Sequence, residues 1–216
     1  MNEGRALSRR APLFSMTSPF DTCAWCAIEG CLVFLDLSQD RYFRLTDDAN
    51  AAALEALQEH GAARRGQPSS LPPPTGWRPA NRAAEAIATG PFRVADVARA
   101  LWMQKRVERQ LAQRSFEAVL TDLHTTLRRA PKRRARSGEA TIRAFEHARL
   151  LRTAADRCLP RSIALALCLA ANGVRSHIVI GVKIAPFGAH CWAQAGDTIL
   201  NDTVEEVSRY APILVI

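Results

Sequence analysis

The pattern of apolar and polar residues changes twice along the 216-residue chain. Short apolar runs at 22–28, 31–37 and 41–45 are separated by two or three polar residues, a spacing typical of strands joined by hairpin turns. Helical spacing of the apolar residues follows. After residue 175, strand-like runs at 176–182, 190–194 and 198–202 predict three further strands, of which the first two are joined by a loop at 183–188. Strands followed by helices and then by strands predict an α+β fold, with an antiparallel sheet packed on helices.

Several stretches in the middle of the chain place apolar residues three and four positions apart, as one face of a helix requires. A proline-rich segment at 64–79 separates the first of these stretches from the others and is typical of an extended linker. The predicted helices cover residues 49–59, 82–88, 94–110, 115–127 and 139–152.

One further helix differs from these because nearly every residue from 159 to 171 is apolar, which predicts burial on most of its surface. Pro160 is tolerated in a first helical turn, and Asn172-Gly173 is a strong stop signal. Cys158 therefore lies at the N-terminal mouth of a core helix. The positive end of the helix dipole lowers a thiol pKa there and favours the thiolate.

The net charge of +8 changes this picture little, because much of the excess lies in one basic run at 128–136. A run without interleaved aromatic residues is typical of a solvated linker, so we predict no nucleic-acid partner, with attraction to an acidic peptide as an alternative. No apolar run is long enough for a membrane span, and no apolar segment follows the arginines at 9–10 as in a signal peptide. We therefore expect a cytoplasmic protein whose six cysteines are reduced thiols.

The cysteines near the N-terminus form a Cys-x-x-Cys pair, Cys23 and Cys26, with Cys31 close behind. Strand alternation places Cys23 and Cys26 on opposite faces, and no second pair or nearby histidine completes a zinc site. We predict no metal site.

Three residues in the order Cys158, His190 and Asp202 have the chemistry of a thiol catalyst. A hairpin turning at Gly196-Asp197 would bring the last two close together. Cys158 would attack a carbonyl, His190 would exchange the proton and Asp202 would orient the imidazole, with the Cys158 backbone N–H as an oxyanion donor. Taken singly, each residue has an alternative structural reading: a core cysteine, a buried structural histidine and a turn aspartate.

Four ordered blocks, at 158–162, 179–182, 186–192 and 200–202, resemble the lasso-peptide maturation B proteins. That family consists of leader peptidases related to transglutaminase-like and papain-like cysteine enzymes, and the resemblance covers roughly residues 142–216. It implies that Cys158 is the nucleophile, His190 the general base and acid, and Asp202 the residue that orients the histidine. The chain departs from the family pattern after Trp192, where Ala193-Gln194 replaces a larger aliphatic residue and a glutamate, so Gln194 receives no catalytic role.

The runs at 31–37 and 41–45, followed by the helix start Thr46-Asp47-Asp48, resemble the peptide-recognition element of such pathways, a winged-helix-like module of three strands followed by helices. The resemblance implies that a leader peptide adds a strand to the exposed edge of this module. That edge would face a helix within 94–110, and the alternative is a hairpin that merely caps the catalytic core. The implied leader-binding residues are Arg41, Tyr42, Phe43, Arg44, Leu45, Leu101 and Trp102.

Together these inferences divide the chain into a loose N-terminus at 1–20, a recognition module at 21–112, a helix and basic linker at 113–138, and a cysteine peptidase domain at 139–216. The implied function is removal of the leader from a ribosomally synthesised lasso precursor. A partner cyclase resembling asparagine synthetase would then close the core peptide, and in the family peptidase activity can depend on that partner and on ATP; the chain itself would bind no cofactor. The alternatives are a transglutaminase-like acyl transferase and a non-catalytic precursor chaperone.

Overall fold

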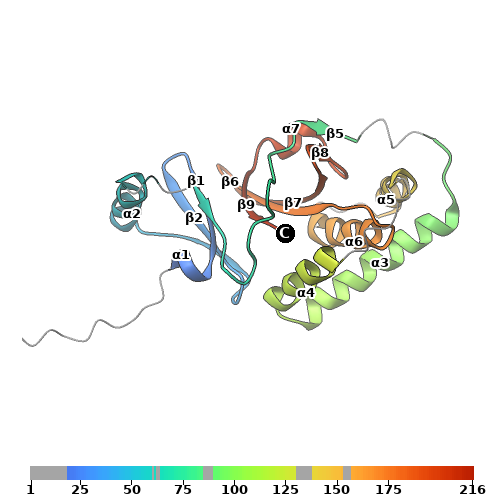
Figure 1. The fold of residues 1–216 in the computed structure, drawn as a ribbon, viewed down its shortest axis with the longest axis horizontal. Helices are drawn as coiled ribbons and strands as arrows, with labels where there is room; N and C mark the ends of the chain where they lie inside the picture. Colours follow the sequence, from blue (N-terminus) through green and yellow to red (C-terminus); the bar gives the residue numbers. More distant parts are fainter. Residues whose placement is uncertain (1–18, 60, 62–63, 85–89, 130–137, 153–156) are drawn as a thin grey trace, which may run out of the picture.

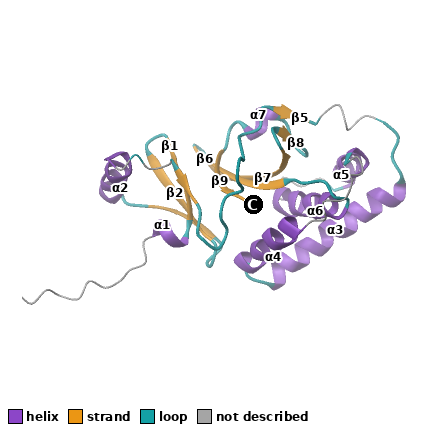
Figure 2. Cartoon of the chain, viewed as in Figure 1, coloured by secondary structure: helices purple, strands orange, loops and turns teal. Residues whose placement is uncertain are grey.

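The computed structural model describes residues 19–59, 61, 64–84, 90–129, 138–152 and 157–216, and has the predicted α+β architecture. Two sheets lie side by side, with α2 beyond the first and a group of helices beyond the second (Figures 1 and 2). The first half contains α1 (Pro19–Thr22), β1 (Ala24–Ile28), β2 (Cys31–Asp36), β3 (Arg41–Arg44), α2 (Asp47–Glu59) and β4 (Arg65–Gly66). The second contains β5 (Arg82–Ala83), α3 (Val94–Gln113), α4 (Phe116–Arg129), α5 (Glu139–Leu151), α6 (Cys158–Ala171), β6 (His177–Ile184), β7 (Phe187–Ala195), β8 (Thr198–Ile199), α7 (Val204–Val207) and β9 (Ala211–Val215).

The N-terminal sheet has the antiparallel order β3-β2-β1-β4 and is buried on both faces. Ala24 and Leu35 pair on the face toward the second half, and Phe34 and Phe43 pair on the face toward α2. Apolar residues at successive positions in β1 and β2 make this double burial possible. The predicted three strands are present, and β3 forms one edge of the sheet.

The fourth strand, β4, corrects the prediction of an extended linker from residue 64. It pairs with β1, where Gly66 lies opposite Trp25. A Cβ on Gly66 would lie 2.3 Å from Trp25 Nε1, so the indole covers this position only because glycine has no side chain. Two residues are too few for strand alternation, which explains why sequence periodicity missed β4.

The second sheet has the order β5-β8-β7-β6-β9 and is mixed, because β5 runs parallel to β8 while the other pairs are antiparallel. This corrects the expectation of a wholly antiparallel sheet. It also corrects the helix predicted at 82–88, since Arg82 and Ala83 form β5; residues 85–89 lie outside the described part. The Ala84 N–H donates to the Ile199 carbonyl at 2.8 Å, so pairing with a distant strand overrides local helical spacing.

The hairpin of β6 and β7 is longer than predicted. Ile184 pairs with Phe187 across a two-residue turn, where the sequence suggested a loop from 183 to 188. His190 consequently lies within a strand, opposite Gly181, and not at a strand end. The strand predicted through Asp202 is shorter than expected and ends at Ile199.

The helices in the second half surround α6, whose apolar side chains pack against β7. Helix α3 packs against α5 and α6 (Figure 1), whereas the predicted boundary at residue 112 would group it with the N-terminal sheet. Basic residues Arg128 and Arg129 end α4, and the rest of the predicted basic linker, at 130–137, is outside the described residues. The predicted loose N-terminus likewise lies outside them up to residue 18. No described helix combines the length and apolarity needed to cross a bilayer.

The two halves share one hydrophobic core. Cys26 and Leu35 from the first sheet belong to the same buried cluster as Leu165 of α6 and Ile180 of β6. Gln67, just after β4, reinforces the junction: its side chain accepts from the Val215 N–H at 2.9 Å and donates to the Val215 carbonyl at 3.0 Å and the Leu71 carbonyl at 2.8 Å. The amide thus supplies partners for backbone groups at the edge of β9 that no strand pairs with.

We predict that Gln67→Ala lowers the free energy of unfolding by about 1–3 kcal/mol, because backbone groups of β9 lose their partners in a partly buried position. Calorimetry or urea unfolding measures the change. Gln58→Ala, on the exposed face of α2, serves as the matched control and should leave stability nearly unchanged. A wild-type unfolding curve for Gln67→Ala would contradict the role assigned to this junction.

Candidate active site

The thiol of Cys158 is positioned by the first turn of α6, as the apolar run and Pro160 predict. Arg157 precedes the helix in a non-helical conformation, and Cys158 is partly buried. The rest of α6 is held in the core by Ile163, Leu165 and Leu169, which are each at most 2% exposed. The rigid burial of the helix therefore fixes where the sulfur lies.

The imidazole of His190 comes from β7, where it lies between aromatic neighbours. Its ring centroid is 5.1 Å from that of Tyr210, whose hydroxyl donates to Glu206 Oε1 at 3.2 Å. Gly181, the strand partner of His190, makes this packing possible, because a Cβ there would lie 2.8 Å from Tyr210 Cβ and 2.9 Å from Trp192 Cζ3. Glycine at this position therefore gives the aromatic side chains room beside the imidazole.

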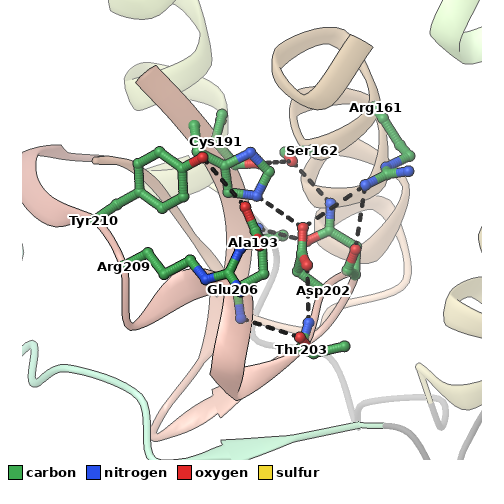
Figure 3. A network of polar contacts seen from close by, with 11 residues as sticks. Arg161, Ser162, Cys191, Ala193, Asp202, Thr203, Glu206, Arg209 and Tyr210 are labelled. Carbon is green, nitrogen blue, oxygen red and sulfur yellow. Dashed lines mark hydrogen bonds and ion pairs between the residues drawn. The ribbon is translucent and has the colours of Figure 1, made fainter. Parts of the chain in front are cut away.

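Asp202 lies where the predicted hairpin geometry placed it, next to His190. The Nε2 atom of His190 is 2.8 Å from Asp202 Oδ2. The second carboxylate oxygen of Asp202 accepts the Thr203 N–H at 2.9 Å, one of the contacts drawn in Figure 3. With the thiol of Cys158 hydrogen-bonded to His190, all three side chains predicted to act together meet in one place.

The electrostatics of the group favour separated charges on the thiol and the imidazole. Burial raises the pKa of Cys158, but the hydrogen bond and the positive charge of His190, with backbone hydrogen bonds at Cys191 and Leu159, lower it below its ordinary value. Burial lowers the pKa of His190, but Asp202 and Cys158 raise it to about 9. Burial also raises the Asp202 pKa, but hydrogen bonds from His190 and the Thr203 N–H, together with the positive charges of His190 and Arg161, lower it below its ordinary value. The site can therefore hold a thiolate beside an imidazolium near neutral pH.

All six cysteines of the chain are free, and Cys158 differs in its pKa shift from four of the other five. Burial is the main cause that raises the thiol pKa of Cys23, Cys26, Cys168 and Cys191. Cys23 and Cys26 belong to different core clusters, as the strand alternation predicted. Among the described residues, no three His, Cys, Asp or Glu side chains are grouped to hold a metal ion.

A buried polar network holds the three elements of the site together (Figure 3). The Asn201 side chain accepts the Ala193 N–H and donates to Ser162 Oγ, both at 2.8 Å. Ser162 in turn donates to the Cys191 carbonyl at 3.0 Å. This chain connects α6, β7 and the segment carrying Asp202, so it fixes the relative positions of the thiol, the imidazole and the carboxylate. Ser162 and Asn201 are absent from the predicted site, although two polar residues within apolar surroundings were a usable signal.

Contacts of Arg161 and of Glu108 hold the first turn of α6 and the residue before it. Arg161 Nη2 lies 3.4 Å from the Asn201 carbonyl oxygen and 3.9 Å from Asp202 Oδ2. On the other side, Glu108 of α3 pairs with Arg152 at 3.1 Å and with Arg157 at 3.9 Å. Because Arg157 directly precedes the nucleophile, α3 takes part in positioning the thiol. The sequence offered no signal for this long-range pairing.

Gln194, which departs from the family pattern, lies two residues beyond Trp192 and is buried. Its amide donates to the Arg78 carbonyl at 2.6 Å and to the Gly196 carbonyl at 2.7 Å. These contacts hold the β7–β8 turn and the segment before β5, a structural role in keeping with the absence of a predicted catalytic one.

The predicted leader-binding residues fall into two separate groups. Arg41 and Arg44 are exposed on the edge strand β3, while Phe43 stacks on Phe34 with ring centroids 5.1 Å apart, and Leu45 packs toward α2. Tyr42 points the other way, and its ring centroid lies 5.6 Å from that of Phe187. Burial is the main cause that raises the Tyr42 pKa, with smaller contributions from Cys191, Asp40 and Cys158.

Leu101 and Trp102 do not face β3, which corrects the predicted arrangement. The helix packed on the N-terminal sheet is α2, because α3 uses its apolar face against α5 and α6. Both residues instead line a cavity at the end of α5. Sequence periodicity identified an amphipathic helix here, but only the tertiary packing determined its partners.

The pKa shifts predict how the reactivity of Cys158 depends on pH. Alkylation by iodoacetamide should rise with pH through a midpoint below that of an ordinary thiol, because only the thiolate reacts. In His190→Ala the thiol stays buried but loses its cationic partner, so the rate at pH 7 should fall by about tenfold or more. Peptide mass spectrometry follows the modification at residue 158.

The matched control is His177→Ala, which removes a partly buried histidine from the neighbouring strand β6 and should preserve the wild-type profile. Equal profiles for wild type and His190→Ala would contradict the inferred thiolate–imidazolium pair.

Comparisons with known proteins indicate the family of the chain. The 45 residues that match the microcin J25-processing protein McjB of Escherichia coli are 40% identical, and they cover 21% of this chain and 22% of that protein. No solved structure gives a significant match. A family model described as the transglutaminase-like superfamily matches residues 100–215, just over half of the chain, from within α3 to the end of β9. The chain therefore belongs to the transglutaminase-like superfamily.

Proposed function

We propose that this protein is a cysteine peptidase that removes the leader from a ribosomally synthesised lasso precursor peptide. The observation that carries the proposal is the contact of His190 with both Cys158 and Asp202 at the start of a buried helix. Nucleophilic catalysis needs this combination: a thiolate, a proton carrier beside it, and a carboxylate that orients the carrier.

In the proposed reaction, the Cys158 thiolate attacks the carbonyl carbon of the scissile peptide bond. His190 transfers its proton to the leaving amine as the C–N bond breaks, which leaves a thioester on Cys158. Water, deprotonated by His190, then hydrolyses the thioester and restores the thiolate of Cys158 beside the imidazolium of His190. Asp202 keeps the imidazole oriented, and the Cys158 backbone N–H at the helix start is a candidate donor to the oxyanion. These steps require no cofactor on this chain.

The edge strand β3 supplies a means of holding the leader. An edge strand has backbone groups on one side without a strand partner, so an extended peptide can pair with it. Tyr42 of β3 contacts Phe187, and Phe187 lies in the same strand as His190. A leader paired with β3 would therefore have its following residues near Cys158.

The partial match to a protein named for processing microcin J25 supports a peptide substrate. Because the match covers 22% of that protein, its activity is carried over only as part of the proposal. The proposed product is a core peptide with a free N-terminal amine, used by a partner cyclase that resembles asparagine synthetase and consumes ATP. We place both steps in the cytoplasm.

The second candidate function is acyl transfer, which the superfamily match favours because an amine could replace water at the thioester. A chaperone without catalysis is the third. Product mass separates all three: hydrolysis adds one water across a peptide bond, transfer forms an amide cross-link, and a chaperone leaves the precursor unchanged.

We predict that the purified protein, incubated with the precursor with and without cyclase and ATP, yields leader and core fragments whose summed mass exceeds the precursor by one water. Cys158→Ala should abolish cleavage and retain leader binding, whereas Cys168→Ala, a matched change further along α6, should retain both. The rate should rise as Cys158 ionises and decline above about pH 9, as His190 loses the proton that the leaving amine needs. Cleavage by Cys158→Ala would rule out the proposed nucleophile.

Strand pairing at β3 predicts a periodic response to changes in the leader backbone. A series of leader peptides, each N-methylated at one residue, should lose affinity at alternate positions, because only every second N–H of a paired strand points at its neighbour. Isothermal titration calorimetry measures the affinities. The change is made in the peptide because Phe43 packs on Phe34, so a proline in β3 would also disturb the core. Uniform sensitivity, or none, would exclude the strand-addition mode.

A further inference from the structure

A cavity of about 410 Å³ opens on the outer side of the helical group, between α3 and the end of α5. Its lining residues include neither Cys158 nor any residue of the edge strand β3. Trp102 is 57% exposed and Leu151 69% exposed, with the neighbouring Leu150 at 71%. Such exposure of large apolar side chains in one region is typical of an interaction surface. The lining residues are Leu101, Trp102, Lys105, Arg106, Arg109, Leu151 and Arg152.

Among the described residues that line this cavity, every charged one is a cation. Lys105 and Arg109 follow Leu101 at helical spacing, so the positive charges lie along one face of α3 beside the apolar side chains. The Arg106 guanidinium lies 5.7 Å from the centroid of the Trp102 ring, which keeps the indole in place as a platform. Arg152 Nη1 is buried and has no hydrogen-bond partner among the described residues. The cavity therefore combines an apolar wall with four cations, of which Arg152 already pairs with Glu108.

We propose that this cavity is the docking surface for an acidic segment of a partner protein. An aliphatic or aromatic side chain of that segment would cover Trp102 and Leu151, and its carboxylates would pair with Lys105, Arg106 and Arg109. Apolar and cationic groups within one small cavity match such a segment better than a phosphate backbone, which would leave the leucines uncovered. This interaction lies beyond the proposed peptidase function and does not depend on it.

The surface is connected to the candidate active site through Arg152. This residue lines the cavity and also pairs with Glu108, which in turn pairs with Arg157 just before Cys158. A variant of Arg152 would therefore alter the nucleophile helix as well as the cavity. The test uses residues that touch the cavity alone.

The test measures binding of a fluorescein-labelled synthetic peptide with glutamates flanking leucine and phenylalanine, by fluorescence anisotropy. The full-length protein should bind it saturably. Trp102→Ala and the double variant Arg106→Glu/Arg109→Glu should each raise the Kd by at least about tenfold, as expected for a central anchor and its charge partners. Hydrogen exchange with the same peptide should show protection within α3 and the end of α5.

The matched control is Arg128→Glu/Arg129→Glu, which removes the same charge from the exposed end of α4 and should leave the Kd nearly unchanged. An equal loss in this control would mean non-specific attraction and overturn the proposal. So would equal binding of a peptide with glutamine in place of glutamate, since charge pairing would then be irrelevant. Displacement of the probe by a leader peptide or by oligothymidine would assign the cavity to those ligands instead. Cleavage is not measured, so failure here leaves the proposed function unaffected.

Discussion

The packing of α6 against β7 is the constraint on which the site depends. An apolar helix buried on most of its surface cannot shift without opening the core, so its first residue has a fixed distance from the strand beside it. Cys158 occupies that first residue, and His190 lies in the strand. Ser162 and Asn201 add directional hydrogen bonds to this packing. Burial has two opposite effects on the pKa of Cys158. It raises this pKa by desolvating the thiolate, and it also strengthens the interaction with His190, which lowers the pKa.

The N-terminal sheet contributes to this arrangement because it is buried on both faces. One face packs against α2, and the other shares the core of the second half, so the strand proposed to hold a peptide has a fixed orientation toward the thiol. Tyr42 and Phe187 meet at the boundary between the two. A shared core of this kind favours unfolding in one transition, with recognition and chemistry built on the same rigid frame.

The arginines of the helical group fall into two sets, one paired with a glutamate and one beside exposed apolar side chains. Arg152 and Arg157 meet Glu108 near the nucleophile helix, whereas Arg106 and Arg109 stand on the outer face of α3 beside exposed apolar side chains. The first set orders the interior of the helical group. The second set has the composition of a surface that binds an acidic segment. Attraction to an acidic peptide was the alternative that the net charge left open.

The sequence by itself determined the elements whose signals are local: the start of α6 at Cys158, the amphipathic helices, the strands of the first hairpins, and the closeness of His190 to Asp202 across one turn. Only the tertiary structure decided the rest. Strands β4 and β5 have two residues each, too few for periodicity, and form because distant strands offer them backbone partners. The same holds for α3. Its apolar spacing predicted a buried face but not which elements bury that face, so Leu101 and Trp102 were expected beside β3. Local patterns encode which face of an element is buried, whereas its partner is chosen by long-range packing that no window of sequence contains.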